Sequence, residues 1–142
     1  MIENAVIEAF MEQCEFKELP ESLVADYRTS METNLTNEAT MYGMDAATLC
    51  YYYYGMDLQT FLDTYAPESA KQILAFQAVA NAEGLNMTDE ELEADLQEFA
   101  TANGYASVDE FIGTNTREEY KEYYMFEDVL AFLVENAVVT DK

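Results

Sequence analysis

Apolar residues along this chain recur every three or four positions, the spacing of amphipathic helices. In the stretch 69–83 they leave only a thin polar edge, so we expect a helix with neighbours on most sides. Gly84 ends this helix, because glycine adopts the left-handed conformation at little steric cost. A second helix starts at Thr88, whose hydroxyl and backbone can exchange hydrogen bonds with Glu91 in a capping box. The two helices are predicted to form a helical hairpin.

The rest of the chain follows the same helical spacing. We expect a short helix to about Cys14, a helix of about six turns that begins with Pro20 in its first turn, and a last helix to about Asn136. Two more capping boxes are predicted, at Ser107 to Glu110 and at Thr116 to Glu119. Strand-like alternation is almost absent, and no linker rich in Pro, Gly or Ser divides the chain. The sequence therefore predicts an all-α fold in one domain, residues 1–142, with Val138 and Val139 in an extended tail.

A short motif occurs twice in the middle of the chain. Tyr42-Gly43-Met44-Asp45 recurs twelve residues later as Tyr54-Gly55-Met56-Asp57. Each copy combines a glycine that ends a helix with an aspartate that caps the next one. We therefore expect two short helices in succession here, with Pro67 starting the apolar helix that follows.

The charge of the chain restricts its partners. Of 142 residues, 29 are acidic and 6 basic, which gives a formal net charge of -23, while 50% are hydrophobic, which disfavours disorder. An acidic surface repels nucleic acid and anionic lipid, so we predict no direct nucleic-acid partner and no membrane partner. No apolar run reaches the roughly 18 residues that a membrane span needs. Cationic or apolar partners suit this charge.

The cysteines and the N-terminus indicate a compartment. Cys14 and Cys50 are the two cysteines, and neither belongs to a CxxC motif, so free thiols in a reducing compartment are expected. The first ten residues carry acidic side chains where a signal peptide carries basic ones. We therefore predict a cytoplasmic protein. The chain also starts inside a helical pattern, which suggests that it is cut from a longer protein.

Catalytic chemistry has little support in the sequence. There is no histidine, which excludes Ser-His and Cys-His nucleophile pairs and histidine metal sites. The acidic run from Asp89 to Glu91, with Glu93 and Asp95, could hold a cation, but helix N-termini favour acidic residues and no EF-hand pattern is present. Paired carboxylates are supported only by the surplus of acidic residues. We predict no catalytic residue, no metal and no cofactor.

The run Tyr51-Tyr52-Tyr53-Tyr54 is the most unusual feature of the sequence. Four consecutive helical residues point in all directions, so some rings must face solvent or a partner. Two interpretations stay open: the rings pack at the joint of two short helices with their hydroxyls in water, or they form an adaptable binding surface. Methionines flank the run, and methionine suits promiscuous apolar surfaces. The candidate substrate-binding set is Met41, Met44, Tyr51, Tyr52, Tyr53, Tyr54, Met56 and Phe61.

Several short motifs, in their shared order and spacing, resemble the C-terminal domain of trigger factor, the bacterial ribosome-associated chaperone. The resemblance extends from about Ala5 to Val139. It rests on these motifs: Leu19-Pro20-Glu21-Ser22-Leu23-Val24, Gly55-Met56-Asp57-Leu58, Ala80-x-x-Glu83-Gly84-Leu85 followed by Thr88-Asp89-Glu90-Glu91, and the ending from Phe132 to Thr140. The Tyr51 to Tyr54 run departs from the family pattern. Related peptide-binding helices occur in SurA-like chaperones.

The resemblance implies a helical body with two protruding arms around an apolar cradle that binds unfolded or nascent polypeptides. It also implies that ribosome docking and proline isomerisation belong to domains of the parent protein that are missing from these residues. A body helix would be missing too, which could leave a bare apolar surface near Ile2 to Phe10 or along the last helix, with a homo-oligomer as one outcome. The alternative function is a helical interaction module with one defined partner. The two functions are distinguished by the number of unrelated proteins that the chain binds, because a chaperone should slow the aggregation of several.

Overall fold

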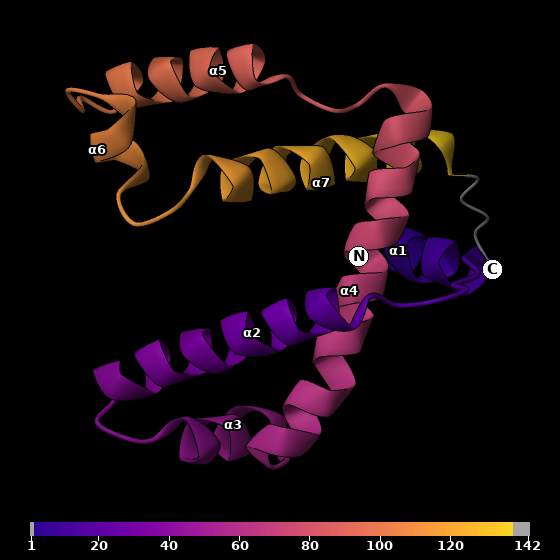
Figure 1. Ribbon diagram of the computed structural model, residues 1–142, viewed down its shortest axis with the longest axis vertical. Coiled ribbons are helices and arrows are strands. Elements are labelled where there is room, and N and C mark those ends of the chain that lie inside the picture. The colour runs from indigo at the N-terminus through magenta and orange to yellow at the C-terminus, as the bar shows by residue number, and fades with distance from the viewer. Residues whose placement is uncertain (1, 138–142) are drawn as a thin grey trace. The chain divides into compact units, whose positions relative to one another are not determined.

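The computed structural model describes residues 2–137, so the predicted tail at Val138 and Val139 lies outside the described residues. Within the described part every regular element is a helix, which confirms the all-α prediction. The helices are α1 (Ile2–Gln13), α2 (Glu21–Met41), α3 (Ala46–Tyr54), α4 (Leu58–Glu83), α5 (Asp89–Ala102), α6 (Val108–Ile112) and α7 (Arg117–Asn136), as Figure 1 shows. None of the helices in residues 2–137 combines the length and apolar character needed to cross a bilayer.

The chain forms two compact units, and α4 contributes residues to both. One, the α2–α3 unit, comprises Cys14–Leu74. The other, the α5–α7 unit, comprises Met1–Gln13 and Ala75–Lys142. The prediction of one domain over the whole chain stays a prediction.

In the α2–α3 unit, a tight turn joins two helices over a small core. The backbone at Gly43 is left-handed, with φ of 69°, and the N–H of Met44 donates to the carbonyl of Ala39 at 3.0 Å, which satisfies a carbonyl at the end of α2. The Asp45 carboxylate then accepts from the N–H of Thr48 at 2.7 Å and caps α3. The core beneath consists of Leu35, Ala39, Leu49, Cys50, Phe61 and Leu62.

Polar contacts also tie α2 to α4 in this unit. The Arg28 guanidinium forms an ion pair with Asp63 and donates to the side-chain oxygen of Gln59 at 2.6 Å.

Pro20 precedes α2 as its N-cap with an extended backbone and so lies just outside the first turn in which the sequence placed it. The core position of Cys50 raises the pKa of its thiol through loss of hydration.

The second copy of the repeated motif opens a long helix and not a short one. The Asp57 carboxylate accepts from the N–H of Thr60 at 3.0 Å, as predicted for a cap, but α4 then continues for 26 residues. The expectation that Pro67 starts a helix is wrong, because Pro67 lies inside α4. A proline in a helix interior removes one backbone hydrogen bond. Packing compensates here, since Ala66 and Ala70 on either side are completely buried.

In the α5–α7 unit, the predicted end of α4 and start of α5 are present, but the two helices do not form the predicted hairpin, because α5 packs on α6 and α7 and not along α4 (Figure 1). The N–H of Leu85 donates to the carbonyl of Ala80 at 2.9 Å, with Gly84 in the left-handed conformation at φ of 68°. The capping box at α5 is reciprocal: the Thr88 hydroxyl accepts from the N–H of Glu91 at 3.2 Å, and the Glu91 carboxylate accepts from the N–H of Thr88 at 2.8 Å.

The other two predicted capping boxes differ from each other. The box at α7 is complete, since Thr116 and Glu119 each accept from the backbone N–H of the other. At α6, Ser107 accepts from the N–H of Glu110 at 3.1 Å, but the Glu110 carboxylate accepts from Ala106 at 2.8 Å and not from Ser107. The Glu110 carboxylate thus bonds to Ala106, one residue before the N-cap residue that a capping box requires.

Two apolar clusters hold the α5–α7 unit together. Leu92 and Leu96 on the apolar stripe of α5 pack with Val108 and Ile112 of α6. Phe76 of α4 is completely buried and stacks on Phe126 of α7, with ring centroids 4.6 Å apart. The ring of Phe10 lies 6.0 Å from Phe76 on another side, so this phenylalanine joins α1, α4 and α7.

The acidic residues at the start of α5 bind basic side chains of α7. Lys121 forms an ion pair with Asp89 at 2.6 Å, and Arg117 binds Glu93 at 2.7 Å and Asp109 at 3.0 Å. Hydrogen bonds to these cations hold the pKa of Asp89 and that of Glu93 below their usual values. Residues 2–137 contain no cluster of three or more cysteine, aspartate or glutamate side chains placed to hold a metal. Within the acidic run, Asp89 and Glu93 are paired with α7 and Glu91 caps α5.

We expect moderate salt to stabilise the fold. The surplus of negative charge is repulsive, and raising ionic strength from about 0.01 M to about 0.15 M shortens the screening length from about 30 Å to about 8 Å. Ion pairs such as Arg28–Asp63 and Lys121–Asp89 are weakened by the same change, but their side chains are partly exposed and contribute little. Thermal melts followed by circular dichroism at the two salt concentrations test this. A melting temperature that falls as sodium chloride is added contradicts it.

Candidate functional site

The turn between α2 and α3, together with the end of α3, exposes large apolar side chains. Met41 is 84% exposed, Tyr52 80% and Tyr51 69%, although buried side chains of the same unit lie next to them in the chain at Leu49 and Cys50. Exposed apolar groups gathered in one place on a folded protein mark interaction sites. We call this set the tyrosine surface: Met41, Tyr42, Met44, Tyr51, Tyr52, Tyr53 and Tyr54.

Tyr52, Tyr53 and Tyr54 of this surface form a series of ring contacts that reaches Phe61 in the core. Tyr52 and Tyr53 have centroids 5.9 Å apart, and Tyr53 meets Tyr54 edge-on at 6.2 Å. Tyr54 then packs on Phe61 at 4.5 Å, and Phe61 packs on Tyr65 at 4.9 Å. Such centroid distances lie in the range where aromatic pairs attract each other. The exposed rings are therefore held by neighbours on one side and are open to a partner on the other.

Two members of the predicted set do not belong to the surface. Phe61 is 8% exposed and is part of the core of the α2–α3 unit, and Met56 is partly buried against that core. The reason is the position of the cap: α4 starts directly after Asp57, which turns Phe61 inward together with Leu62. Phe61 supports Tyr54 from below, and Met56 fills space beside the core.

Tyr53 is the member of the surface with a defined polar anchor. Its hydroxyl donates to a carboxylate oxygen of Glu38 on α2 at 3.0 Å. Hydrogen bonds to Glu38 and to Tyr42 raise the pKa of Tyr53 to about 12. Tyr53 therefore stays neutral near neutral pH and links α3 to α2. Tyr53 and Tyr54 pack at the joint of the helices, as one interpretation of the run expected, while Tyr51 and Tyr52 are exposed to solvent and their role in binding stays a prediction.

Two exposed tyrosines were missing from the predicted set: Tyr42, a member of the tyrosine surface, and Tyr65, which lies next to it. Tyr42 is exposed beside Met41, and the ring of Tyr65 lies 6.4 Å from that of Tyr54. The repeated motif contains the signal that could have found them. Tyr42 occupies the same place in the first copy as Tyr54 in the second, and Tyr65 corresponds in the same way to Tyr53.

The tyrosine surface also differs from the rest of the chain in charge. Charged residues make up 25% of the chain, but Asp45 is the single charged residue between Ala39 and Met56. Its carboxylate is engaged in the α3 cap, and hydrogen bonds from Thr48 lower its pKa. An aromatic area with few charges, Glu38 beside Tyr53 being one of them, can hold apolar chain segments without a fixed pattern of polar contacts.

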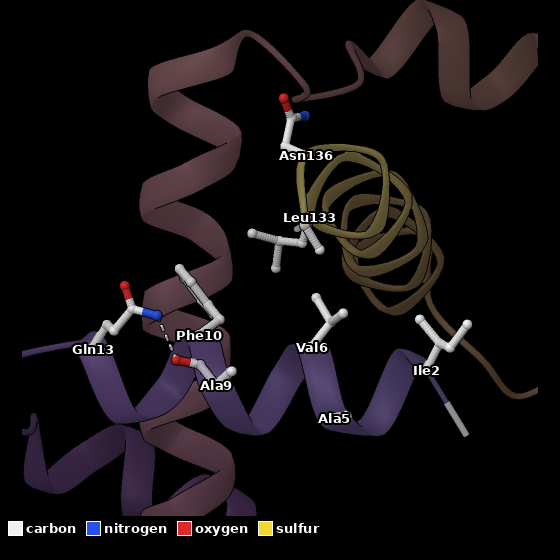
Figure 2. Close-up of a pocket in the computed structure, with 9 residues that line it drawn as sticks. Ile2, Ala5, Val6, Ala9, Phe10, Gln13, Leu133 and Asn136 are labelled. Atoms are coloured by element: carbon white, nitrogen blue, oxygen red, sulfur yellow. Dashed lines mark hydrogen bonds between the residues drawn. The ribbon is translucent and has the colours of Figure 1, made fainter. Parts of the chain in front are cut away.

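A separate apolar groove lies in the α5–α7 unit, between α1 and the end of α7. It has a volume of about 470 Å³. Figure 2 shows Val6 of α1 and Leu133 of α7 on its facing sides, while the Gln13 side chain bonds to the carbonyl of Ala9 at 2.9 Å. The sequence predicted a bare apolar surface near Ile2 to Phe10 or along the last helix, and the groove lies between these two segments. The groove is lined by Ile2, Ala5, Val6, Ala9, Phe10, Gln13, Leu133, Asn136 and Ala137.

Comparison with known proteins identifies the family. Residues 1–140 match the sequence family described as bacterial trigger factor protein (TF) C-terminus. Curated relatives include trigger factors of Synechococcus sp. strain CC9311, 31% identical over 98% of this chain, strain RCC307, 29% over 96%, and Geobacter metallireducens, 28% over 99%. No solved structure matches the chain with statistical significance.

The matched region is a limited part of those relatives. The chain spans 30%, 27% and 33% of their respective lengths. The match lies in the helical C-terminal part of trigger factor and not in its isomerase part, as the sequence resemblance predicted. Membership supports a chaperone-type role for this region. The chain belongs to the family of bacterial trigger factor C-terminal domains.

Proposed function

We propose that this chain is a chaperone domain that binds unfolded or nascent polypeptide segments, and that the tyrosine surface is a place where they bind. The observation that carries the proposal is the exposure of Met41, Tyr51 and Tyr52 on a stretch almost without charge. The family supports binding of unfolded polypeptides in general. The residues that do so are our proposal.

The chemistry of the surface suits many different clients. A tyrosine ring offers roughly 150–250 Å² of contact area with few rotatable bonds, so its ordering costs little entropy. Methionine adapts its shape to varied neighbours. Each ring that a client covers contributes on the order of 1 kcal/mol, so a client that touches two or three of them is held weakly and can leave to fold.

The charge of the chain supports the same role. A net charge of -23 keeps complexes with apolar clients apart from one another and disfavours contact with nucleic acid. In this proposal the domain acts in the cytoplasm, and any ribosome contact is made through a different domain of a longer parent protein. Client segments approach the tyrosine surface through apolar contacts, while the acidic remainder of the chain stays hydrated.

The second candidate is an interaction module with one defined partner, seated in the groove between α1 and α7. The volume of this groove and its apolar lining favour it. A second copy of the chain is one such partner. The two functions differ in breadth, because a chaperone binds unrelated unfolded proteins and a defined interface binds one protein.

Suppression of aggregation tests the proposal. Three chemically unfolded proteins of unrelated fold are diluted with and without the 142-residue chain, and light scattering is recorded. We expect the chain to slow aggregation of all three. An Ile2→Ser/Val6→Ser variant, changed in the groove and checked for folding by circular dichroism, should do the same. A chain that slows none or one of the three, or whose effect disappears with the groove variant, contradicts the proposal.

A further inference from the structure

The exposed methionines of the described chain gather at one place. Among residues 2–137, Met41 and Met44 have exposed side chains, and both lie beside the turn that joins α2 to α3. Met125 is 4% exposed, Met31 and Met56 pack against the core of the α2–α3 unit, and Met87 packs against the core formed by α5 and α6. Met11 is also partly buried. Solvent thus reaches the two methionines of the tyrosine surface most freely.

We propose that Met41 and Met44 form an oxidation-sensitive site through which a peroxide lowers the affinity of the tyrosine surface for clients. This inference rests on the proposed function and adds a form of regulation to the same surface. The reactant is hydrogen peroxide or another two-electron oxidant of the same class. The product is methionine sulfoxide at exposed positions of a folded protein.

The chemistry is a two-electron oxygen transfer. A lone pair of the thioether sulfur attacks one oxygen of the peroxide, an S–O bond forms and the O–O bond breaks. The sulfur is oxidised by two electrons, the peroxide is reduced, and the departing hydroxide takes the proton from the oxygen now bound to sulfur, which leaves the sulfoxide and one water. The sulfoxide is polar and can be returned to the thioether by methionine sulfoxide reductases. No group of the protein is consumed besides the thioether.

The position of the two residues decides what oxidation changes. At Met41 the new oxygen faces water, so the fold tolerates it, but a polar S=O group now lies where an apolar client side chain would pack. At Met31, Met56 or Met125 the same oxygen would enter a packed interior and destabilise the fold. Oxidation limited to the exposed pair therefore weakens client binding and preserves the structure.

Competing thiols react slowly in this chain. The thiolate is the reactive form of cysteine, and burial raises the pKa of Cys14 and of Cys50, which lowers the thiolate fraction near neutral pH. Cys50 is also completely buried. Burial therefore shields Cys50 from mild peroxide, and Cys14, which is half-buried, is mapped together with the methionines.

The experiment combines peptide mass mapping with client holding. The 142-residue chain is treated with increasing hydrogen peroxide, and modified residues are mapped at each dose. We expect Met41 to be oxidised first, Met44 next and Met125 last among these three. At the dose that modifies the first two, the circular dichroism spectrum should be unchanged and client holding should fall by roughly threefold, in line with the loss of an apolar contact.

A matched variant separates this inference from the proposed function. Met41→Leu/Met44→Leu keeps apolar side chains at both positions but removes the thioethers, so its client holding, measured against the same variant without peroxide, should not change with treatment. Sulfoxide reductases should restore holding in the treated parent chain. Equal loss of holding in parent and variant, or full holding by a parent chain oxidised at both residues, overturns the inference while the proposed function stands. An untreated chain that holds no client overturns both.

Discussion

Replacing Tyr51 and Tyr52 by serine should weaken the holding of unfolded clients about tenfold while the melting temperature stays nearly the same. The two rings are the most exposed of the tyrosine run, so their removal opens no cavity. Loss of about 1.4 kcal/mol of client contact, which is modest for two tyrosines at a binding site, corresponds to a tenfold change in affinity. Client holding is measured as the chain concentration that halves the rate of aggregation, and stability by thermal melts.

The choice of residues in this variant follows from the structure. Tyr53 bonds to Glu38 and Met56 packs against the core, so replacing these two would mix a binding effect with a loss of stability. A control variant, Tyr105→Ser/Tyr123→Ser, removes two exposed tyrosines from the α5–α7 unit. It should hold clients like the parent chain. Equal holding by the parent chain and the folded Tyr51→Ser/Tyr52→Ser variant would remove the tyrosine surface from the proposed mechanism.

Replacing Phe76 by alanine should have the largest effect on stability, a loss of about 3–5 kcal/mol in the free energy of unfolding. Phe76 is completely buried and contacts Phe126 and Phe10, so the change removes contacts to two other helices at once and leaves a cavity that these helices cannot fill by small movements. Urea unfolding followed by circular dichroism at 222 nm, a wavelength where helices dominate, measures the loss.

The matched control for this variant is Phe99→Ala on α5. Phe99 is 47% exposed, so its truncation removes fewer contacts and should cost below about 1 kcal/mol. Similar costs for the two variants would mean that the packing of α1, α4 and α7 around Phe76 is not the main support of the α5–α7 unit.

The sequence predicted most of the helices because their ends have local chemical signals. Thr88 and Thr116 each face a glutamate three residues on, and both capping boxes are present. Gly84 adopts the left-handed backbone that ends α4. In each case the hydrogen bonds that define the boundary lie within a few residues, so no knowledge of tertiary contacts was needed.

Pro67 shows where local signals fail. A proline favours the first turn of a helix, and the sequence prediction therefore began a helix there. In the structure the helix has already started at Leu58, and the buried Ala66 and Ala70 hold it together through the proline. The burial of these alanines is a property of the folded unit, which the spacing of residues along the chain does not reveal.

The residues of the candidate site could be predicted from the sequence, but not which of their side chains face the core and which face solvent. The tyrosine run and the flanking Met41 and Met44 could be identified as unusual residues, and the structure exposes them. Sequence alone could not separate Phe61, which faces the core, from Tyr54, which lies above it at 4.5 Å. That difference depends on the register of α4 after its cap at Asp57.

Site-specific crosslinking at Tyr52 is the most direct test of client binding at the tyrosine surface. A photoreactive phenylalanine derivative replaces Tyr52 in one sample and Tyr123 of the α5–α7 unit in another, and each is illuminated with three unrelated proteins in unfolded and in native form. We expect crosslinks from position 52 to all three unfolded proteins and few to the native forms, with few crosslinks from position 123. Crosslinks from position 52 no more frequent than those from position 123 would contradict the account.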